Sequence, residues 1–209
     1  MTTPSDLRDS RDSLRVDGGR LWRSLMELAE IGATPKGGVR RLALTDLDRQ
    51  GRDLVVGWLR DAGANTEVDG AGNIFAIRPG RDPAARVVLT GSHIDTQPSG
   101  GKFDGNYGVL AGLEVLRTLN DAKVATDKPV GVAIWTNEEG SRFVPVMGGS
   151  GAFAGVFTLE HLLQVAFEAQ VGADCRRRVT KLAVHRREML VIGMPDVDGH
   201  LDEPGDDIA

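Results

Sequence analysis

One imidazole and four carboxylates stand at positions where a folded sheet would bring them together. His93 and Asp95 are two residues apart, Asp104 follows nine residues later, and Glu138 and Glu139 are adjacent. Imidazole and carboxylate groups together are typical ligands of zinc, manganese, cobalt or nickel, and a further carboxylate beside such ions can act as a base. The pattern therefore indicates metal-assisted hydrolysis.

His93 allows two interpretations. A single histidine in an apolar setting is usually a core residue whose ring is hydrogen-bonded to the main chain. The Asp95 carboxylate two residues later favours a metal ligand, because it can hold one ring nitrogen, define the tautomer and leave the other nitrogen for a cation.

The other carboxylates also allow an ordinary interpretation. Asp104 stands at the expected start of a helix, so it is either the N-terminal cap of that helix or a carboxylate that bridges two cations. Glu138 and Glu139 are either a solvated surface pair or a divided pair, in which one binds metal and the other reaches the attacking water.

Apolar periodicity predicts the elements that position these groups. Because buried strands alternate with helices, we expect an α/β fold with a mostly parallel, helix-covered sheet. His93 and Asp95 then follow one strand and Glu138 the next, and ligands of such sheets gather beyond the carboxyl ends of strands. The expected helices are 21–32, 45–63 with Thr45 as cap, and 107–119, and the expected strands are 66–68, 73–77, 87–90 and 130–135.

Composition excludes several classes of protein. Apolar residues make up 41% and charged residues 26%, as in an ordinary globular protein, and the net charge of −5 gives no reason to expect nucleic acid or an anionic membrane as a partner. Residues 1–19 are polar and predict no signal peptide. The single cysteine, Cys175, has no internal disulfide partner, so we expect a cytoplasmic location.

Two glycine-rich stretches do not satisfy the nucleotide-binding motifs that they approach. Residues 97–102 lack the first glycine and the final Ser or Thr of a phosphate loop. Residues 149–154 have neither a preceding strand nor a suitably spaced acidic residue, so we interpret them as a tight turn into a helix.

The chain resembles the dinuclear-metal amidohydrolases of the M20 metallopeptidase superfamily, a branch that includes N-carbamoyl-L-amino-acid hydrolases, β-ureidopropionases and allantoate amidohydrolases. The resemblance covers residues 20–161. Its motifs are Gly91-Ser92-His93-Ile94-Asp95-Thr96, Gly100-Gly101-Lys102-Phe103-Asp104-Gly105, Thr136-Asn137-Glu138-Glu139-Gly140-Ser141-Arg142-Phe143 and Met147-Gly148-Gly149-Ser150-Gly151.

The resemblance implies a role for each residue. His93 would bind one metal ion, Asp104 would bridge two, and Glu139 would bind the second. Glu138 would be the general base, and Asp95 would orient His93. Two divalent cations (Zn, Mn, Co or Ni) about 3.5–4 Å apart would then activate water for cleavage of a linear amide or ureido C–N bond. A homodimer acting on a small-molecule substrate is expected for the full-length family.

The resemblance also implies a division of the chain. We expect a disordered tail over 1–19, the N-terminal part of a truncated M20-like catalytic domain over 20–161, and a divergent tail over 162–209. The abrupt loss of the family pattern near residue 161 suggests a shifted reading frame. Two histidine ligands of the family are missing from the matched part, and His161, His185 and His200 are poor substitutes for them.

These features predict a metal-dependent amidohydrolase of N-carbamoyl-L-amino acids or β-ureido acids, with weak metal binding and little turnover in this chain. The alternatives are an inactive remnant of such an enzyme, or an aminoacylase or allantoate hydrolase of the same superfamily.

Overall fold

The first two helices of the described residues each have a side-chain cap at the N-terminus. In this computed structural model, which describes residues 14–168 and 189–191, the Asp17 carboxylate accepts the N–H of Arg20, and the Thr45 hydroxyl accepts the N–H of Asp48. The Thr45 cap is as predicted. The elements are α2 (Gly18–Glu30), α3 (Asp46–Asp61), β1 (Asn65–Val68), β2 (Ile74–Arg78), β3 (Val87–His93), α4 (Asn106–Asp121), β4 (Val130–Trp135), α5 (Gly148–Ala154), α6 (Leu159–Glu168) and β5 (Met189–Val191).

The structure places a helix across each of the two segment boundaries that the sequence suggested. Helix α2 begins at Gly18, so the last two residues of the expected tail 1–19 are helical. Helix α6 crosses the boundary at residue 161 without interruption. Residues 1–13, and most of 162–209, lie outside the described residues.

Strands β1 and β2, which correspond to the predicted strands 66–68 and 73–77, form a hairpin. Their antiparallel pairing runs from Asn65 opposite Ile77 to Val68 opposite Ile74. The turn is stabilised by Asp69, whose Oδ1 accepts the N–H groups of Ala71 and Asn73 at 2.9 Å each. Aspartate favours such turns because its short side chain satisfies main-chain donors that the strands leave unpaired.

The sheet is mixed rather than mostly parallel. Its order is β1-β2-β4-β3-β5, in which β3 pairs in parallel with β4 and β5, while β2 pairs antiparallel with β1 and β4. The α/β class is confirmed. The antiparallel pairing of β1 with β2 follows from the hairpin, since two strands joined by a tight turn must run in opposite directions.

Strand β3 is longer than the predicted 87–90. Its parallel pairing with β4 continues to His93 opposite Trp135, through Gly91 and Ser92, which lack the apolar pattern of a buried strand. A Cβ at Gly91 would overlap the main chain of Ala133, so glycine permits the two strands to stay paired there. His93 is therefore the last residue of the strand, and its position is held by sheet hydrogen bonding.

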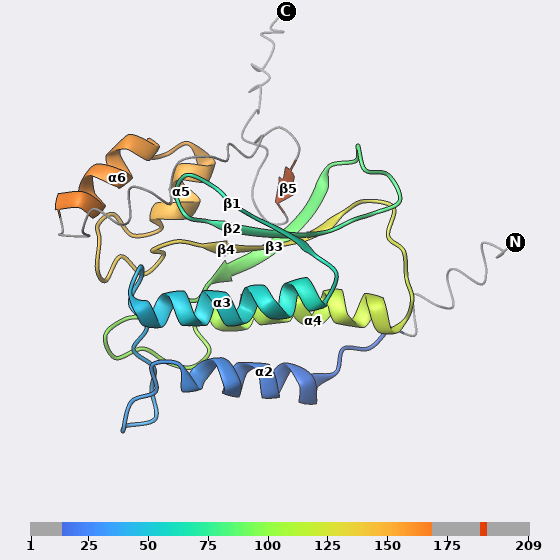
Figure 1. Ribbon diagram of the computed structural model, residues 1–209, viewed down its shortest axis with the longest axis horizontal. Helices are drawn as coiled ribbons and strands as arrows, with labels where there is room; N and C mark the ends of the chain where they lie inside the picture. Colours follow the sequence, from blue (N-terminus) through green and yellow to red (C-terminus); the bar gives the residue numbers. More distant parts are fainter. Residues whose placement is uncertain (1–13, 169–188, 192–209) are drawn as a thin grey trace, which may run out of the picture.

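Helices α2, α3 and α4 all lie on one side of the sheet (Figure 1). Helix α4 packs on β3 and β4, α3 packs on β1 and β2, and α2 packs on α4 and α3. The buried core between them contains Leu28, Val55, Leu59, Leu110, Leu113, Leu116, Val132 and Ile134. Each Å² of apolar surface that these side chains bury stabilises the fold by about 25 cal/mol. The core therefore holds the ends of the strands in place.

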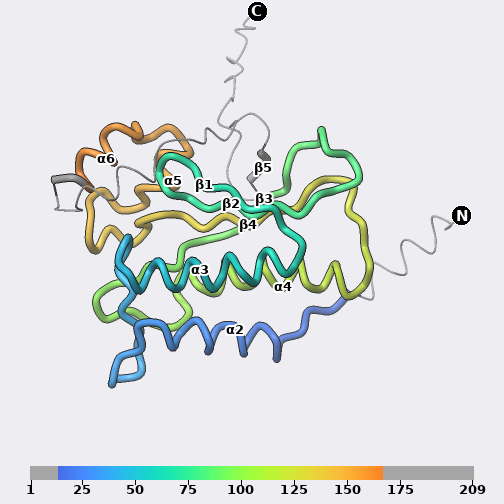
Figure 2. The backbone as a smooth tube through the Cα atoms, viewed as in Figure 1, coloured from blue at the N-terminus to red at the C-terminus, as the bar shows by residue number. Residues whose placement is uncertain are grey.

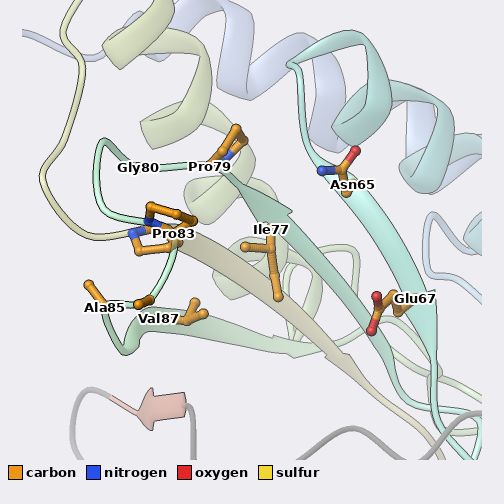
Figure 3. A pocket seen from close by; sticks show the side chains of 10 residues that line it. Asn65, Glu67, Ile77, Pro79, Gly80, Pro83, Ala85 and Val87 are labelled. Carbon is orange, nitrogen blue, oxygen red and sulfur yellow. The ribbon is translucent and has the colours of Figure 1, made fainter.

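After β4 the chain leads to α5 and α6, at the end of the sheet to which the β3 arrow points in Figure 1, and the path of the chain can be followed in Figure 2. No helix in the described ranges is long and apolar enough to cross a bilayer. At the opposite end, a groove of about 410 Å³ is lined by residues at the start of β3 and the end of β2, including Val87, Ile77 and Pro79 (Figure 3). This groove is separate from the strand ends that carry the predicted chemistry.

Candidate metal centre

The ring of His93 is almost fully buried and held from one side. Its Nδ1 lies 2.9 Å from the main-chain oxygen of Asp95, and the residue is 4% exposed. A carbonyl oxygen can only accept a hydrogen bond, so Nδ1 carries a proton, and in the neutral form of the ring the lone pair is at Nε2. That nitrogen is the one available to a cation.

Two carboxylates face this lone pair. Glu138 Oε2 lies 3.2 Å from Nε2, and Asp104 Oδ1 lies 3.9 Å from it. The Glu138 and Asp104 side chains are 32% and 73% exposed, whereas that of His93 is 5% exposed, so the cluster opens to solvent on the carboxylate side. Three electron-rich groups repel one another unless a proton or a cation lies between them. Their chemistry suits a divalent cation.

The Asp95 carboxylate has a different role from the one predicted. Main-chain oxygen, not the carboxylate, makes the hydrogen bond that defines the His93 tautomer; Asp95 Oδ1 is 3.6 Å from Nδ1. The two carboxylate oxygens instead accept the main-chain N–H groups of Glu138 and Glu139, at 3.3 Å each. Asp95 thus connects the end of β3 to the segment after β4.

Burial raises the pKa of the Asp95 carboxyl above its ordinary value. The nearby Asp48 acts in the same direction, while His93 and the two main-chain N–H groups oppose the shift. The ionised carboxylate is therefore held against a desolvation cost by the donors that it organises.

Asp104 is not a helix cap. Helix α4 starts after Gly105, which makes no side-chain capping bond, and the Asp104 carboxylate is directed toward His93 instead. The capping interpretation is therefore wrong, and the carboxylate is left for the cluster.

Glu139 joins the cluster indirectly. Its N–H binds Asp95, and its Oε2 accepts a hydrogen bond from Gln97 Nε2 at 3.0 Å. Within 14–168 and 189–191, no three His, Cys, Asp or Glu side chains are spaced to hold a metal ion as they stand. Cation binding would therefore require the Asp104 carboxylate to move closer to His93 Nε2 and the Glu139 carboxylate to leave Gln97 and turn toward Asp104.

Three polar residues that support the cluster were not anticipated from the sequence: Arg41, Asn73 and Asn106, all almost fully buried. Asn73 accepts the Thr136 N–H and donates to the Gly149 oxygen, so it fixes the segment after β4. For Asn73, the only signal in the sequence was its position beside a turn. Arg41 follows an exposed arginine in a predicted connection, and its sequence context does not distinguish it.

We expect Gly105→Ala to disturb the cluster strongly. Gly105 has φ +64°, and a Cβ there would overlap the His93 ring around Nε2. We predict a loss of roughly 1–3 kcal/mol in the free energy of unfolding from the backbone strain alone, measured by urea denaturation. Gly101→Ala is the control, because a Cβ at Gly101 meets nothing within 4 Å. Equal stability of the two variants would contradict the prediction.

Fold and cluster together define an α/β protein with an imidazole–carboxylate centre beyond the carboxyl ends of two adjacent parallel strands. The model of Peptidase family M20/M25/M40 matches residues 89–198, and the chain belongs to this family. The match extends past residue 161.

Curated relatives and solved structures agree with this assignment. The chain is 54% identical over 150 residues to an N-carbamoyl-L-amino-acid amidohydrolase of Rhizobium meliloti, covering 72% of this chain and 36% of the relative. It is 40% identical over 131 residues to an allantoate amidohydrolase of Bacillus subtilis, covering 63% of this chain and 32% of the relative. A hydantoinase/carbamoylase family amidase from Burkholderia multivorans superposes with a TM-score of 0.71 at 64% identity, covering 71% of this chain and 36% of that structure. The chain thus spans about a third of the length of these proteins.

Proposed function

We propose that this chain carries the metal-binding centre of an amidohydrolase that cleaves the ureido C–N bond of N-carbamoyl-L-amino acids or related ureido acids. The observation that carries the proposal is the position of His93 Nε2, which faces the carboxylates of Glu138 and Asp104 while Nδ1 is held by a main-chain oxygen. The names of the relatives support the substrate class.

The donor set suits two divalent cations. His93 and Glu139 would each hold one ion, and Asp104 would be shared between the two ions. Imidazole and carboxylate ligands serve Zn, Mn, Co and Ni alike. When bound, such ions would polarise the scissile carbonyl and make water a better nucleophile.

Glu138 is proposed as the general base. Its carboxylate lies beside the cluster and is partly open to solvent, where it can take a proton from the attacking water. The water oxygen joins the ureido carbon, one C–N bond breaks, and the same carboxyl group returns the proton to the departing nitrogen, which leaves a carbamic acid. The carbamic acid then loses carbon dioxide, which breaks the second C–N bond, so that the products are a free amino acid, carbon dioxide and ammonia.

Asp95 has a supporting part in this mechanism. Its main-chain oxygen keeps the proton on His93 Nδ1, and its carboxylate holds the main chain of Glu138 and Glu139. One residue therefore sets the geometry of the imidazole relative to both glutamates.

The direct test is ammonia release from N-carbamoyl-L-amino acids by the purified chain with added Zn²⁺ or Mn²⁺. We expect slow release that stops when EDTA removes the cation, in keeping with the little turnover predicted for this chain, and still less release from N-acetyl amino acids and dipeptides. Faster cleavage of N-acetyl substrates would point to an aminoacylase instead.

Calorimetric titration with Zn²⁺ completes the test. Cation binding without ammonia release would favour the alternative of an inactive remnant. A chain that neither binds Zn²⁺ nor releases ammonia would contradict the proposal.

A further inference from the structure

Arg41 is a buried cation at the junction of three segments near the candidate centre. Its relative exposure is 0%, and it is the largest of the fully buried side chains in the described residues. Helix α3 passes so close that its Gly51 leaves no space for a methyl group: a Cβ there would lie 2.8 Å from Arg41 Cδ. The Arg41 side chain is therefore confined by packing along its aliphatic part as well as by the hydrogen bonds of its guanidinium group.

The guanidinium makes four hydrogen bonds. Nε donates to the main-chain oxygen of Ile94 at 2.8 Å, and Nη2 donates to Asn106 Oδ1 at 2.9 Å. Nη1 donates to the main-chain oxygens of Leu28 and Ile31, at 3.0 and 2.8 Å, at the end of α2. One rigid planar group thus connects α2, the residue after β3 and the first residue of α4.

Two of these contacts adjoin the residues of the centre. Ile94 stands between His93 and Asp95. Asn106 begins α4, and its Nδ2 donates to the Lys102 oxygen at 3.0 Å, which closes the turn that carries Asp104. Arg41 therefore connects the segment that carries His93 to the turn that carries Asp104.

The acceptors of Arg41 are neutral, which is an unusual setting for a buried charge. Burial lowers the pKa of Arg41 from its ordinary value to about 10, while Asp48 and Asp95 oppose this shift from a distance. The group remains charged at neutral pH. To reach four neutral acceptors at once, the side chain needs the planar, multi-donor geometry of arginine, which lysine cannot reproduce.

We propose that Arg41 is a positioning residue of the cation site, which holds the His93 segment and the Asp104 turn at a fixed separation. The inference rests on the proposed function, since it assigns Arg41 to the centre that the proposal describes. A merely structural role would affect stability alone. A positioning role would also alter the His93 ring and the affinity for a cation in a protein that is still folded.

Arg41→Lys is the test, with Arg78→Lys as the matched control. Arg78 also donates to an amide oxygen and a carbonyl, those of Asn120 and Val124, but it lies in β2 away from the centre. We expect Zn²⁺ affinity, measured by calorimetry, to fall roughly tenfold in Arg41→Lys, the lower end of the range for direct partners of metal ligands, because Arg41 acts on the ligands through Ile94 and Asn106. The control should stay within about twofold, because it touches none of those partners.

The second readout needs no cation. In the unaltered chain, ¹⁵N NMR of the neutral His93 ring should report one tautomer, protonated at Nδ1. In Arg41→Lys we expect a mixture of tautomers, because release of the Ile94 oxygen loosens the segment that presents the Asp95 oxygen. The control should keep the single tautomer.

Gly51→Ala decides the question if Arg41→Lys does not fold. Its methyl group displaces the Arg41 stem while alanine favours the helix. Weaker Zn²⁺ binding together with mixed His93 signals would support the positioning role. A folded variant of either kind with unchanged ring signals and unchanged affinity would overturn it. Failure of the unaltered chain to bind Zn²⁺ would instead overturn the proposed function, and the ring signals would still decide the role of Arg41.

Discussion

Replacing Glu138 by glutamine is expected to slow ammonia release by roughly 10²–10⁴-fold, the usual contribution of a general base. Glutamine keeps the shape of the side chain and the main-chain hydrogen bond from residue 138 to Asp95, so the fold should be unaffected. The reason for the loss is chemical: an amide cannot take up the proton of the attacking water. The measurement is kcat with a saturating N-carbamoyl-L-amino acid and added Zn²⁺.

Glu139→Gln is the matched control for this experiment. Both residues follow β4 and both donate their N–H to Asp95, but only Glu139 is proposed as a cation ligand. We therefore expect Glu139→Gln to weaken Zn²⁺ binding and Glu138→Gln to leave it nearly unchanged. If Glu138→Gln weakens Zn²⁺ binding more than Glu139→Gln does, the two roles are reversed, as the short distance from Glu138 to His93 Nε2 allows.

Replacing Asp95 by asparagine is expected to weaken Zn²⁺ binding by roughly 10–100-fold and to lower the free energy of unfolding by about 1–3 kcal/mol. The amide offers one oxygen where the carboxylate offered two. It therefore turns an N–H donor toward the main-chain N–H of Glu138 or Glu139 and leaves that partly buried donor without an acceptor. Calorimetric titration and urea denaturation measure the two effects.

Two opposing effects determine the size of the stability loss. Burial raises the pKa of the Asp95 carboxyl, so removing the charge also removes a desolvation cost and moves the loss toward the lower end of the range. Cation affinity has no such offset. Asp127→Asn is the control: Asp127 pairs with Arg81 at the surface, and its loss should change stability by less than about 0.5 kcal/mol. Asp95→Asn with the stability and Zn²⁺ affinity of that control would contradict the connecting role of Asp95.

The fold class and the location of the centre could be predicted from the sequence. The apolar runs identified β4 at its observed limits, and the predicted strands 66–68 and 73–77 correspond to β1 and β2. His93 and Glu138 converge as expected, because β3 and β4 are neighbours that run in the same direction. Strand periodicity and parallel pairing are local and regular properties, so sequence patterns carry them well.

The contacts within the centre could not be predicted in the same way. The sequence pattern gave no means to distinguish the main-chain oxygen of Asp95 from its carboxylate as the partner of His93, or Asp104 as a cap from Asp104 as a neighbour of the ring. Those alternatives differ by a few ångströms, which are decided by how the segments after β3 and β4 pack against each other.

The sequence by itself determined which groups could do chemistry and at which ends of which strands they stand. Only the tertiary structure decided how these groups are held: that β3 extends to His93, that Asp95 connects two segments, and that Arg41 is buried behind them. The physical reason is that residue type and periodicity act along the chain, whereas hydrogen-bond partners of buried polar groups are chosen by segments far apart in sequence. For Arg41 these partners lie 10 to 65 residues away.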